Sequence, residues 1–406
     1  MSYNPLETKS TPLNWKRSSL YEVCTFISRG KQPKYVDHSQ IYALNQKSIR
    51  WGEIQIENLK FQNPDINISE DFFVKKNDVV LNSTGTGTVG RAFHFAEKPE
   101  IRMLVDSHVT IIRTNEKILR SAFLYYQFSD YRYQKYINEG LLAGSTGQVE
   151  LNKSKVTGMN ILIPSVIIQD KIIGILSPLD KKIELNNQLI KILEEMTSTL
   201  FNHWFIDFEF PDKNGNPYKS NGGKMIESEF GEIPEGWKVD NFGKFIDIKS
   251  GKRPAIRSDS KTADCNIPIV GASKIMGYTD KQLINESVLV TGRVGTHGII
   301  QRFNEPIWIS DNSFIITSKY EGYVYQIMKN INYSSLNRGT SQPLITQSDL
   351  KGIKIVLPNS EMLLNYSVFY QEFVNKIESL KKENETLKEL RDTLLPKLLS
   401  GEIELE

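Results

Sequence analysis

The residues of this chain best suited to chemistry are cations and neutral hydrogen-bonding side chains next to turn residues. Arg and Lys can pair with phosphate or guanine, Gln can bind adenine, and Ser or Thr hydroxyls can bind either a phosphate or a base. The residues predicted on this basis to contact DNA are Lys31, Gln32, Lys47, Arg50, Ser83, Thr84, Thr86, Arg91, Ser145, Thr146, Gln148, Lys252, Arg253, Arg257, Lys274, Arg293, Thr296, His297, Arg338, Thr340 and Gln342. Any one of them could equally be a solvated surface residue, so the prediction rests on the set.

Charge is distributed unevenly along the chain, although the net charge of its 406 residues is only +2. Residues 14–165 contain 20 Lys and Arg against 15 Asp and Glu, residues 231–358 contain 16 against 12, and the remainder carries −7. A basic block is typical of a nucleic-acid-binding domain, but ordinary surface variation explains an excess of this size equally well.

The glycine-rich segment Gly85–Gly90 is the nearest match to a cofactor-binding motif. It fits G-x-G-x-x-G and follows the apolar run Val79–Leu81. A dinucleotide site needs a helix directly after the glycines, whereas residues 91–95 have the pattern of a strand. We therefore predict a turn whose glycines adopt positive φ. The chain also contains no G-x-x-x-x-G-K-[ST] loop and no Asn/Asp-Pro-Pro-aromatic motif of an amino-methyltransferase.

Metal and nuclease chemistry lack the residues that they require. A loose nuclease-like match combines Asp212 with Asp247 and Lys249, but it straddles the predicted linker, which is rich in Gly, Asn and Pro. No metal-ligand spacing is formed by the histidines, which are His38, His94, His108, His203 and His297. The two cysteines, Cys24 and Cys265, are too few for a disulfide scaffold and fit a reducing cytoplasm.

No segment is suited to span a membrane. The longest uncharged apolar-rich stretch, Val156–Gln169, has 14 residues, whereas a span needs about 20. The N-terminal residues lack the basic and apolar regions of a signal peptide. With 39% apolar and 24% charged residues, the composition predicts a globular, cytoplasmic protein.

Two segments of the chain repeat each other in order. "ISRGKQP" at 27–33 matches "IKSGKRP" at 248–254, and each follows a Trp-Lys pair. Further on, "GTVG" matches "GTHG", and residues 144–164 align without a gap on residues 338–358. Since the landmarks keep their order while loop lengths differ, we predict two copies of one unit.

Each copy ends in a heptad pattern. The apolar positions form one helical stripe in each copy, which favours a coiled coil over two separate core helices. The residues predicted to pack there are Ile183, Ile190, Leu193, Leu200, Trp204, Ile377, Leu380, Leu387, Leu394 and Leu398. Polar residues interrupt both stripes, and Asn384 is predicted to fix register at a cost in stability. The alternative is that Asn384 lies at the solvent-exposed edge of its stripe.

The expected bounds of these helices come from capping residues. Ser177, Pro178 and Asp180 have the pattern of a helix start, and Pro396 is expected near the end of the second helix. The basic blocks instead contain short β-type runs, at 78–81, 109–112, 287–290 and 314–317. These runs alternate with Gly-rich turns, which indicates mixed α/β domains and not a doubly wound sheet.

The framework segments resemble the specificity subunit of bacterial Type I restriction-modification systems. The resemblance rests on "NWKRSSLYEVCTFISRGKQP", "LDKKIELNNQLIKILE", "LFNHWFIDFEFP", "GEIPEGW" and "LRDTLLPKLLSGEIEL", and it covers about residues 14–405. The first copy departs from the pattern because it has no counterpart of "GEIPEGW".

This resemblance implies the domain organisation. Mixed α/β target-recognition domains are expected at residues 14–165 and 231–358, with a linker at 206–230. Spacer helix regions are expected at 166–205 and 359–400. The two long helices would form an antiparallel coiled coil and give the chain pseudo-twofold symmetry.

The resemblance also implies the partners. The chain would bind double-stranded DNA, with each domain contacting one half of a bipartite, asymmetric target. Two modification (methyltransferase) subunits would supply S-adenosylmethionine chemistry, and restriction subunits using ATP and Mg²⁺ can join. The chain itself is expected to have no catalytic residue, cofactor, metal or membrane contact. Two alternatives stay open: a fused methyltransferase or nuclease with an unrecognised centre, and a coiled-coil adaptor whose basic domains bind protein.

Overall fold

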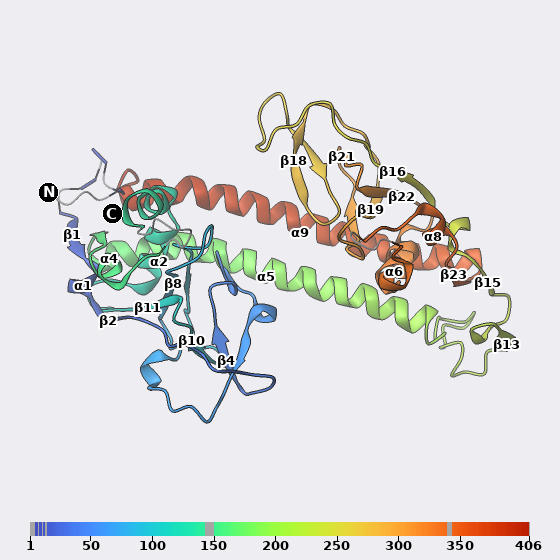
Figure 1. Ribbon diagram of the computed structural model, residues 1–406, viewed down its shortest axis with the longest axis horizontal. Helices are drawn as coiled ribbons and strands as arrows, with labels where there is room; N and C mark the ends of the chain where they lie inside the picture. Colours follow the sequence, from blue (N-terminus) through green and yellow to red (C-terminus); the bar gives the residue numbers. More distant parts are fainter. Residues whose placement is uncertain are drawn as a thin grey trace. The chain divides into compact units, whose positions relative to one another are not determined.

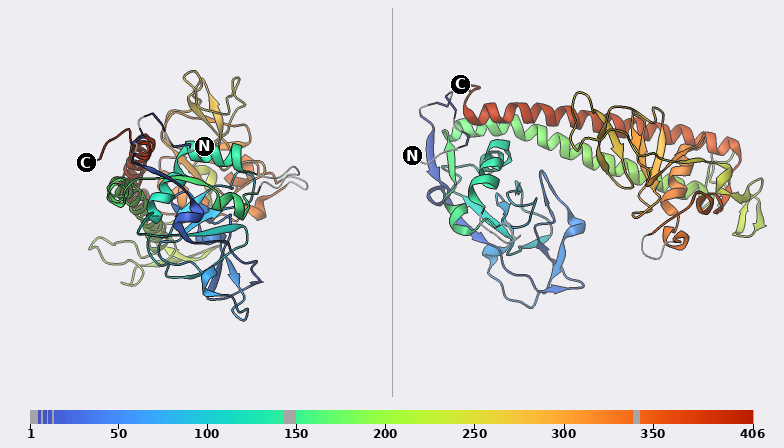
Figure 2. Two further views of the ribbon diagram at one scale, coloured as in Figure 1. Left: turned by 90° about the vertical axis from the view of Figure 1, so that its left-hand side faces the viewer. Right: turned by 45° about the horizontal axis from the view of Figure 1, so that its top comes forward.

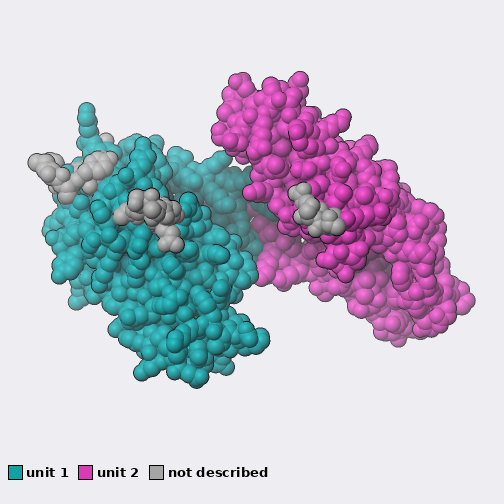
Figure 3. Space-filling view, in the orientation of Figure 1, with its two compact units in different colours: residues 1–188, 381–406 teal, residues 189–380 magenta. Residues whose placement is uncertain are grey.

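The computed structural model of the protein describes residues 5–6, 8–9, 11–12, 14–142, 150–338 and 343–405. The chain divides into two compact units, which Figure 3 shows in different colours. Unit 1 comprises residues 1–188 and 381–406, and unit 2 comprises residues 189–380.

The described residues of unit 1 form two four-stranded sheets and two separate strand pairs. Its strands are β1 (Lys16–Ser19), β2 (Cys24–Arg29), β3 (Tyr35–Val36), β4 (Ile41–Leu44), β5 (Ile49–Arg50), β6 (Glu53–Ile54), β7 (Lys60–Gln62), β8 (Val79–Asn82), β9 (Ala92–His94), β10 (Arg102–Val105), β11 (Val109–Thr114) and β12 (Asn160–Ile163). One sheet has the antiparallel order β2-β11-β8-β9, and the other has the order β10-β4-β7-β3 with β10 parallel to β4. Figure 1 labels β2, β8 and β11 of the first sheet and β4 and β10 of the second. β1 pairs with β12, and β5 with β6.

Unit 2 repeats this strand order. Its strands are β13 (Met225–Ser228), β14 (Gly231–Pro234), β15 (Lys238–Asn241), β16 (Asp247–Ser250), β17 (Ile267–Val270), β18 (Ile275–Thr279), β19 (Val288–Gly292), β20 (Gln301–Phe303), β21 (Trp308–Ile309), β22 (Ser313–Thr317) and β23 (Lys354–Leu357). The order β16-β22-β19-β20 corresponds to β2-β11-β8-β9, and the pair β15-β23 corresponds to β1-β12. The order β18-β17-β21 again combines an antiparallel and a parallel pair.

The mixed α/β class predicted for the two sheet-rich domains is confirmed. The four β-type runs predicted from sequence lie in β8, β11, β19 and β22, which are central or next to central in their sheets. Most neighbouring strands are antiparallel, so neither unit contains a doubly wound parallel sheet among its described residues. Buried apolar side chains on these strands form the domain cores.

One glycine in each unit explains the best-matched segment of the repeat. A side-chain Cβ at Gly30 would lie 2.0 Å from the Val105 carbonyl oxygen, and one at Gly251 would lie 2.2 Å from that of Ser310. Both distances are too short for any side chain, so each position requires glycine. The close approach lets the next residue, Lys31 in unit 1, donate its backbone N–H to Val105 at 2.9 Å.

The shorter helices alternate with strands along the chain, and each of the two long helices includes residues of both units. They are α1 (Leu20–Val23), α2 (Ser121–Ser129), α3 (Tyr131–Tyr136), α4 (Lys153–Thr157), α5 (Val166–Phe205), α6 (Glu321–Asn330), α7 (Tyr333–Leu336), α8 (Gln347–Lys351) and α9 (Ser360–Ser400), with short turns η1 (Ile56–Asn58), η2 (Glu70–Phe72), η3 (Ile137–Leu141) and η4 (Phe242–Lys244). α5 and α9 are continuous over these bounds (Figure 2).

The predicted helix start at Ser177 is wrong. α5 begins at Val166, and Pro178 lies inside it. Ile172 and Leu176, six and two residues before the proline, are fully buried in the unit 1 core. Burial of these side chains outweighs the backbone hydrogen bond that the proline cannot make. The second expected proline was placed correctly, because Pro396 lies four residues before the end of α9.

The two long helices contact each other within each unit. In unit 1, Asn186 Nδ2 donates to Asn384 Oδ1, and Asn384 Nδ2 donates to Asn187 Oδ1, each at 2.9 Å. In unit 2, the Tyr366 hydroxyl donates to the Thr197 carbonyl at 3.4 Å. All ten residues predicted to pack in the stripes are buried or half-buried.

The core of unit 1 includes residues from the C-terminal part of the chain. Leu395, Leu398 and Leu399 are at most 5% exposed and pack in the same cluster as Leu20. Close to them, the Thr11 hydroxyl donates to the Ser400 carbonyl at 3.0 Å.

Among the described residues, no helix has the length and apolar character needed to cross a membrane.

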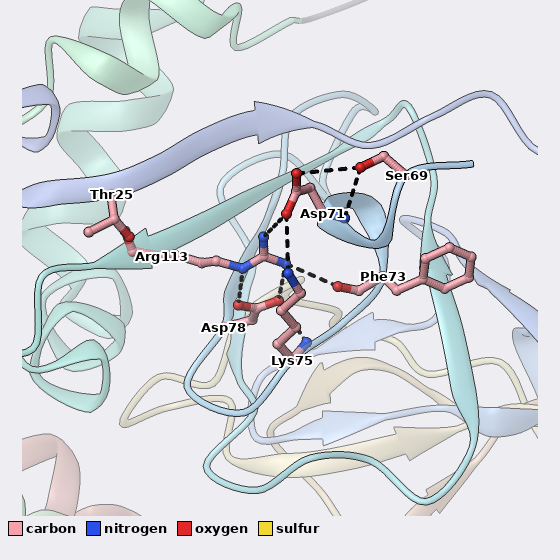
Figure 4. Close-up of polar contacts among 7 residues, drawn as sticks. All are labelled: Thr25, Ser69, Asp71, Phe73, Lys75, Asp78 and Arg113. Atoms are coloured by element: carbon pink, nitrogen blue, oxygen red, sulfur yellow. Dashed lines mark hydrogen bonds and ion pairs between the residues drawn. The ribbon is translucent and has the colours of Figure 1, made fainter. Parts of the chain in front are cut away.

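A buried ion pair holds neighbouring segments of unit 1 together (Figure 4). Arg113 of β11 donates through Nε and Nη2 to the two carboxylate oxygens of Asp78, at 2.7 and 3.0 Å. Nη2 also donates to the Phe73 carbonyl at 3.0 Å. The Asp78 side chain is 1% exposed, so its charge depends on this partner. Outside it, Lys75 donates to Asp71 at 3.2 Å and lowers the pKa of that exposed carboxyl.

Candidate nucleic-acid interface

Four loops of unit 1 meet in one region, which we call loop surface 1. It consists of residues 30–32, 45–47, 83–91 and 106–108. The Ser107 hydroxyl donates to Gln32 Oε1 at 3.0 Å and links the first loop to the last. Asn82, at the end of β8, donates from Nδ2 to the Gln46 carbonyl at 3.0 Å. Strand register therefore brings together residues that are far apart in sequence.

Three of the predicted cations lie on loop surface 1. Lys31 and Lys47 are exposed, and the Lys31 ammonium lies 4.4 Å from the centre of the Phe72 ring. Arg91 is half-buried and donates from Nη2 to the Gly87 carbonyl at 2.8 Å, which orders the glycine loop. Such cations are suited to phosphate contacts, because a phosphate contact does not require the geometry of a particular base.

The other residues predicted for unit 1 differ in their exposure. Gln32 and Thr86 are exposed, whereas Arg50 is half-buried and donates to the carbonyl of its neighbour Ile49 at 3.1 Å. The prediction that Ser83 contacts DNA is wrong, because its side chain is fully buried and its hydroxyl bonds to that of Thr110 at 2.5 Å. The pattern of turn residues does not say which of two neighbours faces the sheet interior.

A hydrogen-bonded group on this surface includes two residues that the sequence prediction missed. The Thr84 hydroxyl lies 2.6 Å from Gln46 Oε1 and 2.9 Å from His108 Nδ1. Thr84 was predicted, but Gln46 and His108 were not, and His108 is exposed. The predicted contact residue Lys47 was the only sequence signal for the loop that contains Gln46. The sequence around His108 contains no signal for a DNA contact.

A buried carboxylate positions the loop that carries His108. Asp106, 2% exposed, accepts the His108 backbone N–H at 2.9 Å and the Tyr35 hydroxyl at 3.1 Å. Burial, together with this neighbouring carboxylate, raises the pKa of Tyr35 to about 12. Tyr35 therefore keeps its proton and acts as a donor to Asp106.

The glycine loop is a turn, as predicted. Gly85, Gly87 and Gly90 have φ of 98°, 75° and 85°. The strand β9 follows, so the segment lacks the helix N-terminus that a pyrophosphate would need. The loop instead presents Thr86 at an exposed position.

Unit 2 forms a corresponding region, loop surface 2. It consists of residues 252–253, 271–274, 292–298 and 310–312. Trp308 Nε1 donates to the Lys252 carbonyl at 2.7 Å, and Gln301 Nε2 donates to the Gly271 carbonyl at 2.9 Å. The Arg293 N–H donates to the Asn312 carbonyl at 2.8 Å.

Three cations of loop surface 2 are exposed. Lys252 and Lys274 are exposed, and the Arg253 side chain is 84% exposed while pairing with Asp311 at 3.2 Å. Arg257 lies beside this surface and donates to the Met276 carbonyl at 2.9 Å. An exposed ion pair contributes little, so Arg253 can exchange its carboxylate for a phosphate at low cost.

Four further predicted residues lie in or beside loop surface 2. Arg293 and His297 are half-buried, and His297 Nδ1 lies 3.3 Å from the Gly292 carbonyl. Thr296 is exposed, and Arg338 is exposed and paired with Asp349. The other predicted residues, Ser145, Thr146, Gln148, Thr340 and Gln342, lie outside the described residues.

The described part of the chain contains no group of three or more His, Cys, Asp or Glu that could hold a metal ion. His94 is bonded to the Ser121 hydroxyl at 3.0 Å, and burial lowers its pKa to about 4. Burial likewise raises the pKa of the Cys24 thiol to about 12, so Cys24 is a poor nucleophile. These shifts arise from packing inside the domain and not from a cleft.

A family model described as Type I restriction modification DNA specificity domain matches residues 12–195 and 234–391. The chain is 28% identical over 313 residues to the Type I restriction enzyme MjaIX specificity subunit of Methanocaldococcus jannaschii, covering 70% of each chain. It is 23% identical over 472 residues to the Type I restriction enzyme HindI specificity subunit of Haemophilus influenzae, covering 96% of this chain and 100% of the relative.

Among solved structures, the chain is similar to the S subunit of a Type I restriction-modification system from M. genitalium. The TM-score is 0.56 at 16% sequence identity, and the match covers 98% of this chain and 99% of the other. At this level of identity the likeness supports a shared fold.

Proposed function

Because the chain belongs to the family of Type I restriction-modification DNA specificity proteins, we propose that it selects a bipartite, asymmetric DNA target through its two loop surfaces. As a member of this family it is the specificity component and not a catalytic one. One observation carries the bipartite proposal: both units repeat one strand order but present different side chains on their loops. A common frame with different contact residues suits two different half-sites.

Within each loop surface, cations and neutral side chains have different roles in this proposal. Lys31 and Lys47 in unit 1, and Lys252 and Lys274 in unit 2, would contact phosphates and set orientation. Neutral groups between them would contact base edges in the major groove, where all four base pairs differ. The exposure of these lysines supports the phosphate role.

We also propose that α5 and α9 form an antiparallel coiled-coil spacer with pseudo-twofold symmetry. The support is local to each unit. In unit 1, Asp180 pairs with Arg391 at 2.9 Å and Asn186 bonds to Asn384, so residue numbers rise along one helix as they fall along the other. The ten packing residues named from the heptads would form its seam.

The partners follow from the family and are proposals for this chain. Two modification subunits would bind it and supply S-adenosylmethionine chemistry on double-stranded DNA. Restriction subunits would add ATP- and Mg²⁺-dependent functions where they are present. The chain would bind neither cofactor itself.

Domain exchange tests the bipartite proposal. Residues 14–165 would be replaced by the matching segment of another family member, and the modified sites of the assembled complex would be mapped across a genome. We expect one half-site to change and the other to persist. A change in both half-sites, or in neither, would contradict the proposal.

A further inference from the structure

We propose that Gln46, Thr84 and His108 act together to recognise one adenine in the half-site bound by unit 1. This inference rests on the proposed function and assigns a base to loop surface 1. The three side chains come from three different loops and meet at one atom, the Thr84 hydroxyl oxygen. We call them the Thr84 triad.

The backbone beneath the Thr84 triad is held on both sides. The Gln46 carbonyl accepts from Asn82 Nδ2 at 3.0 Å. The His108 carbonyl accepts the Ser83 N–H at 2.9 Å, and the His108 N–H donates to the buried Asp106 carboxylate at 2.9 Å. Contact side chains supported in this way need little reorganisation on binding, which favours discrimination between bases.

The Thr84 hydroxyl couples the other two side chains because it has a single proton. If it donates to the Gln46 oxygen, a neutral His108 must donate from Nδ1, which leaves the imidazole Nε2 as an acceptor and the amide NH₂ as a donor. If the amide is turned, Thr84 donates to His108 Nδ1, and the outer atoms become an imidazole N–H donor and an amide oxygen acceptor. Either arrangement presents one donor and one acceptor.

These outer atoms have no partner among the described residues, and His108 is exposed. In the major groove adenine presents the N6 donor beside the N7 acceptor, which complements one acceptor and one donor. Guanine presents two acceptors, so one of them would face the acceptor of the Thr84 triad. Cytosine and thymine each offer only one hydrogen-bonding group there. Adenine is therefore the base that satisfies both outer atoms.

Unit 2 has the same backbone positions but different side chains. Val294 makes an isolated β-bridge to Leu344, as Thr84 does to Glu150. The Arg293 N–H donates to the Asn312 carbonyl, as the Ser83 N–H does to that of His108. Val294 thus takes the place of Thr84, and Asn312 takes the place of His108.

The third position follows from another matched pair of bonds. The Asp106 N–H donates to the Leu44 carbonyl, and the Ser310 N–H donates to that of Val270. Two residues after each acceptor come Gln46 in unit 1 and Ala272 in unit 2. Unit 2 therefore lacks all three side chains of the Thr84 triad. Its residues at the matching positions fit the same backbone arrangement, so they are the substitutions to introduce in unit 1.

The experiment uses the full chain assembled with its modification subunits and a DNA library randomised over both half-sites. Thr84→Val, Gln46→Ala and His108→Asn copy the unit 2 residues. We expect each to reduce the preference for adenine about tenfold at the same single position of one half-site. Thr84→Ser keeps the hydroxyl and should keep the preference.

Two controls make the result specific. Lys47→Ala should weaken binding to all sequences to a similar extent, because a phosphate contact does not distinguish bases. Each variant should retain the preference of the other half-site, which shows that it has folded and assembled.

Three outcomes would overturn the inference: no change in preference, changes at different positions for the three variants, or a position that selects a base other than adenine. Each leaves a sequence-specific complex, so the proposed function survives them. A wild-type complex without any sequence preference would instead overturn the proposed function.

Discussion

The Arg113–Asp78 pair shows how strongly one buried side chain of unit 1 depends on another. In Asp78→Ala, the guanidinium would be left in a site where its side chain is 15% exposed, without its bidentate partner. We expect the free energy of unfolding to fall by about 3–5 kcal/mol. Urea unfolding of the chain measures this loss. Lys75→Ala, which removes only an exposed ion pair, should cost about 1 kcal/mol or less.

His94 should make unit 1 sensitive to mild acid. Burial lowers its pKa from 6.5 to about 4, so between these values the unfolded chain binds a proton that the folded chain does not. The contribution is fully present above about pH 6.5 and is lost as pH falls toward 4. From about pH 7.5 to about pH 5, the loss is about 2 kcal/mol.

His94→Gln supplies the comparison for this prediction. Glutamine does not titrate in this range and can still bond to Ser121. Unfolding measured at both pH values should show a smaller loss for the variant than for the wild type. Equal losses would mean that other groups cause the acid sensitivity.

At this scale the sequence predicted residue types better than their orientation. Lys31, Lys47, Lys252 and Lys274 are exposed on loop surfaces, whereas Ser83 faces the interior. Gln46 and His108 escaped prediction because their partner Thr84 is 38 and 24 residues away. The pairing of β8 with β11 brings His108 to Thr84, and the pairing of β4 with β10 places the Gln46 loop, so both contacts depend on the register of whole sheets.

For the elements, the clearest prediction concerns Asn384 of α9. The heptad pattern alone suggested that its replacement by leucine would raise stability. The structure shows Asn384 to be 5% exposed, with its amide bonded to Asn186 and Asn187. Asn384→Leu should therefore lower the free energy of unfolding by about 1–3 kcal/mol, because it leaves buried polar atoms without a partner.

A double-mutant cycle separates register from stability. Asn186→Leu combined with Asn384→Leu replaces both partners and should recover most of the stability lost in the single variant. We expect the double variant to lose unique alignment of the helices and to associate between chains, as seen by light scattering. A single variant more stable than the wild type would contradict this account.

Periodicity predicted the long helices and the central strands, but local capping residues misplaced one boundary. Ser177 and Pro178 form a good helix start in isolation. Ile172 and Leu176 extend the helix past them because their burial contributes more than a single backbone bond. Tertiary packing of this kind cannot be seen in a window of a few residues.

For the whole molecule, the two basic blocks predict salt-sensitive binding. They carry +5 and +4. If about six phosphates are contacted, log K should fall with log salt at a slope of about −5. Titrating the assembled complex with DNA at several salt concentrations measures this slope, and Lys252→Ala should reduce it by about 1. A slope near zero would argue against phosphate contacts.

The internal repeat was the feature of the whole chain most accessible from sequence. The segments "SRGK" and "KSGK" correspond in the two copies, and their glycines, Gly30 and Gly251, permit close backbone approach. The loops between these landmarks differ in length and side chains. The sequence therefore predicted the shared frame but not which residues the frame brings together.

The mixing of the two ends of the chain in unit 1 has a consequence for synthesis on the ribosome. Leu395, Leu398 and Leu399 belong to the core of unit 1, and they are translated after the whole of unit 2. Unit 2, which ends at Leu380, is complete before unit 1. Synthesis of unit 1 thus begins first, but its core is complete only after the final turns of α9 have been translated. A nascent chain released early would expose an unfinished apolar core to chaperones and proteases, so a premature stop should lead to its degradation and not to a complex with altered specificity.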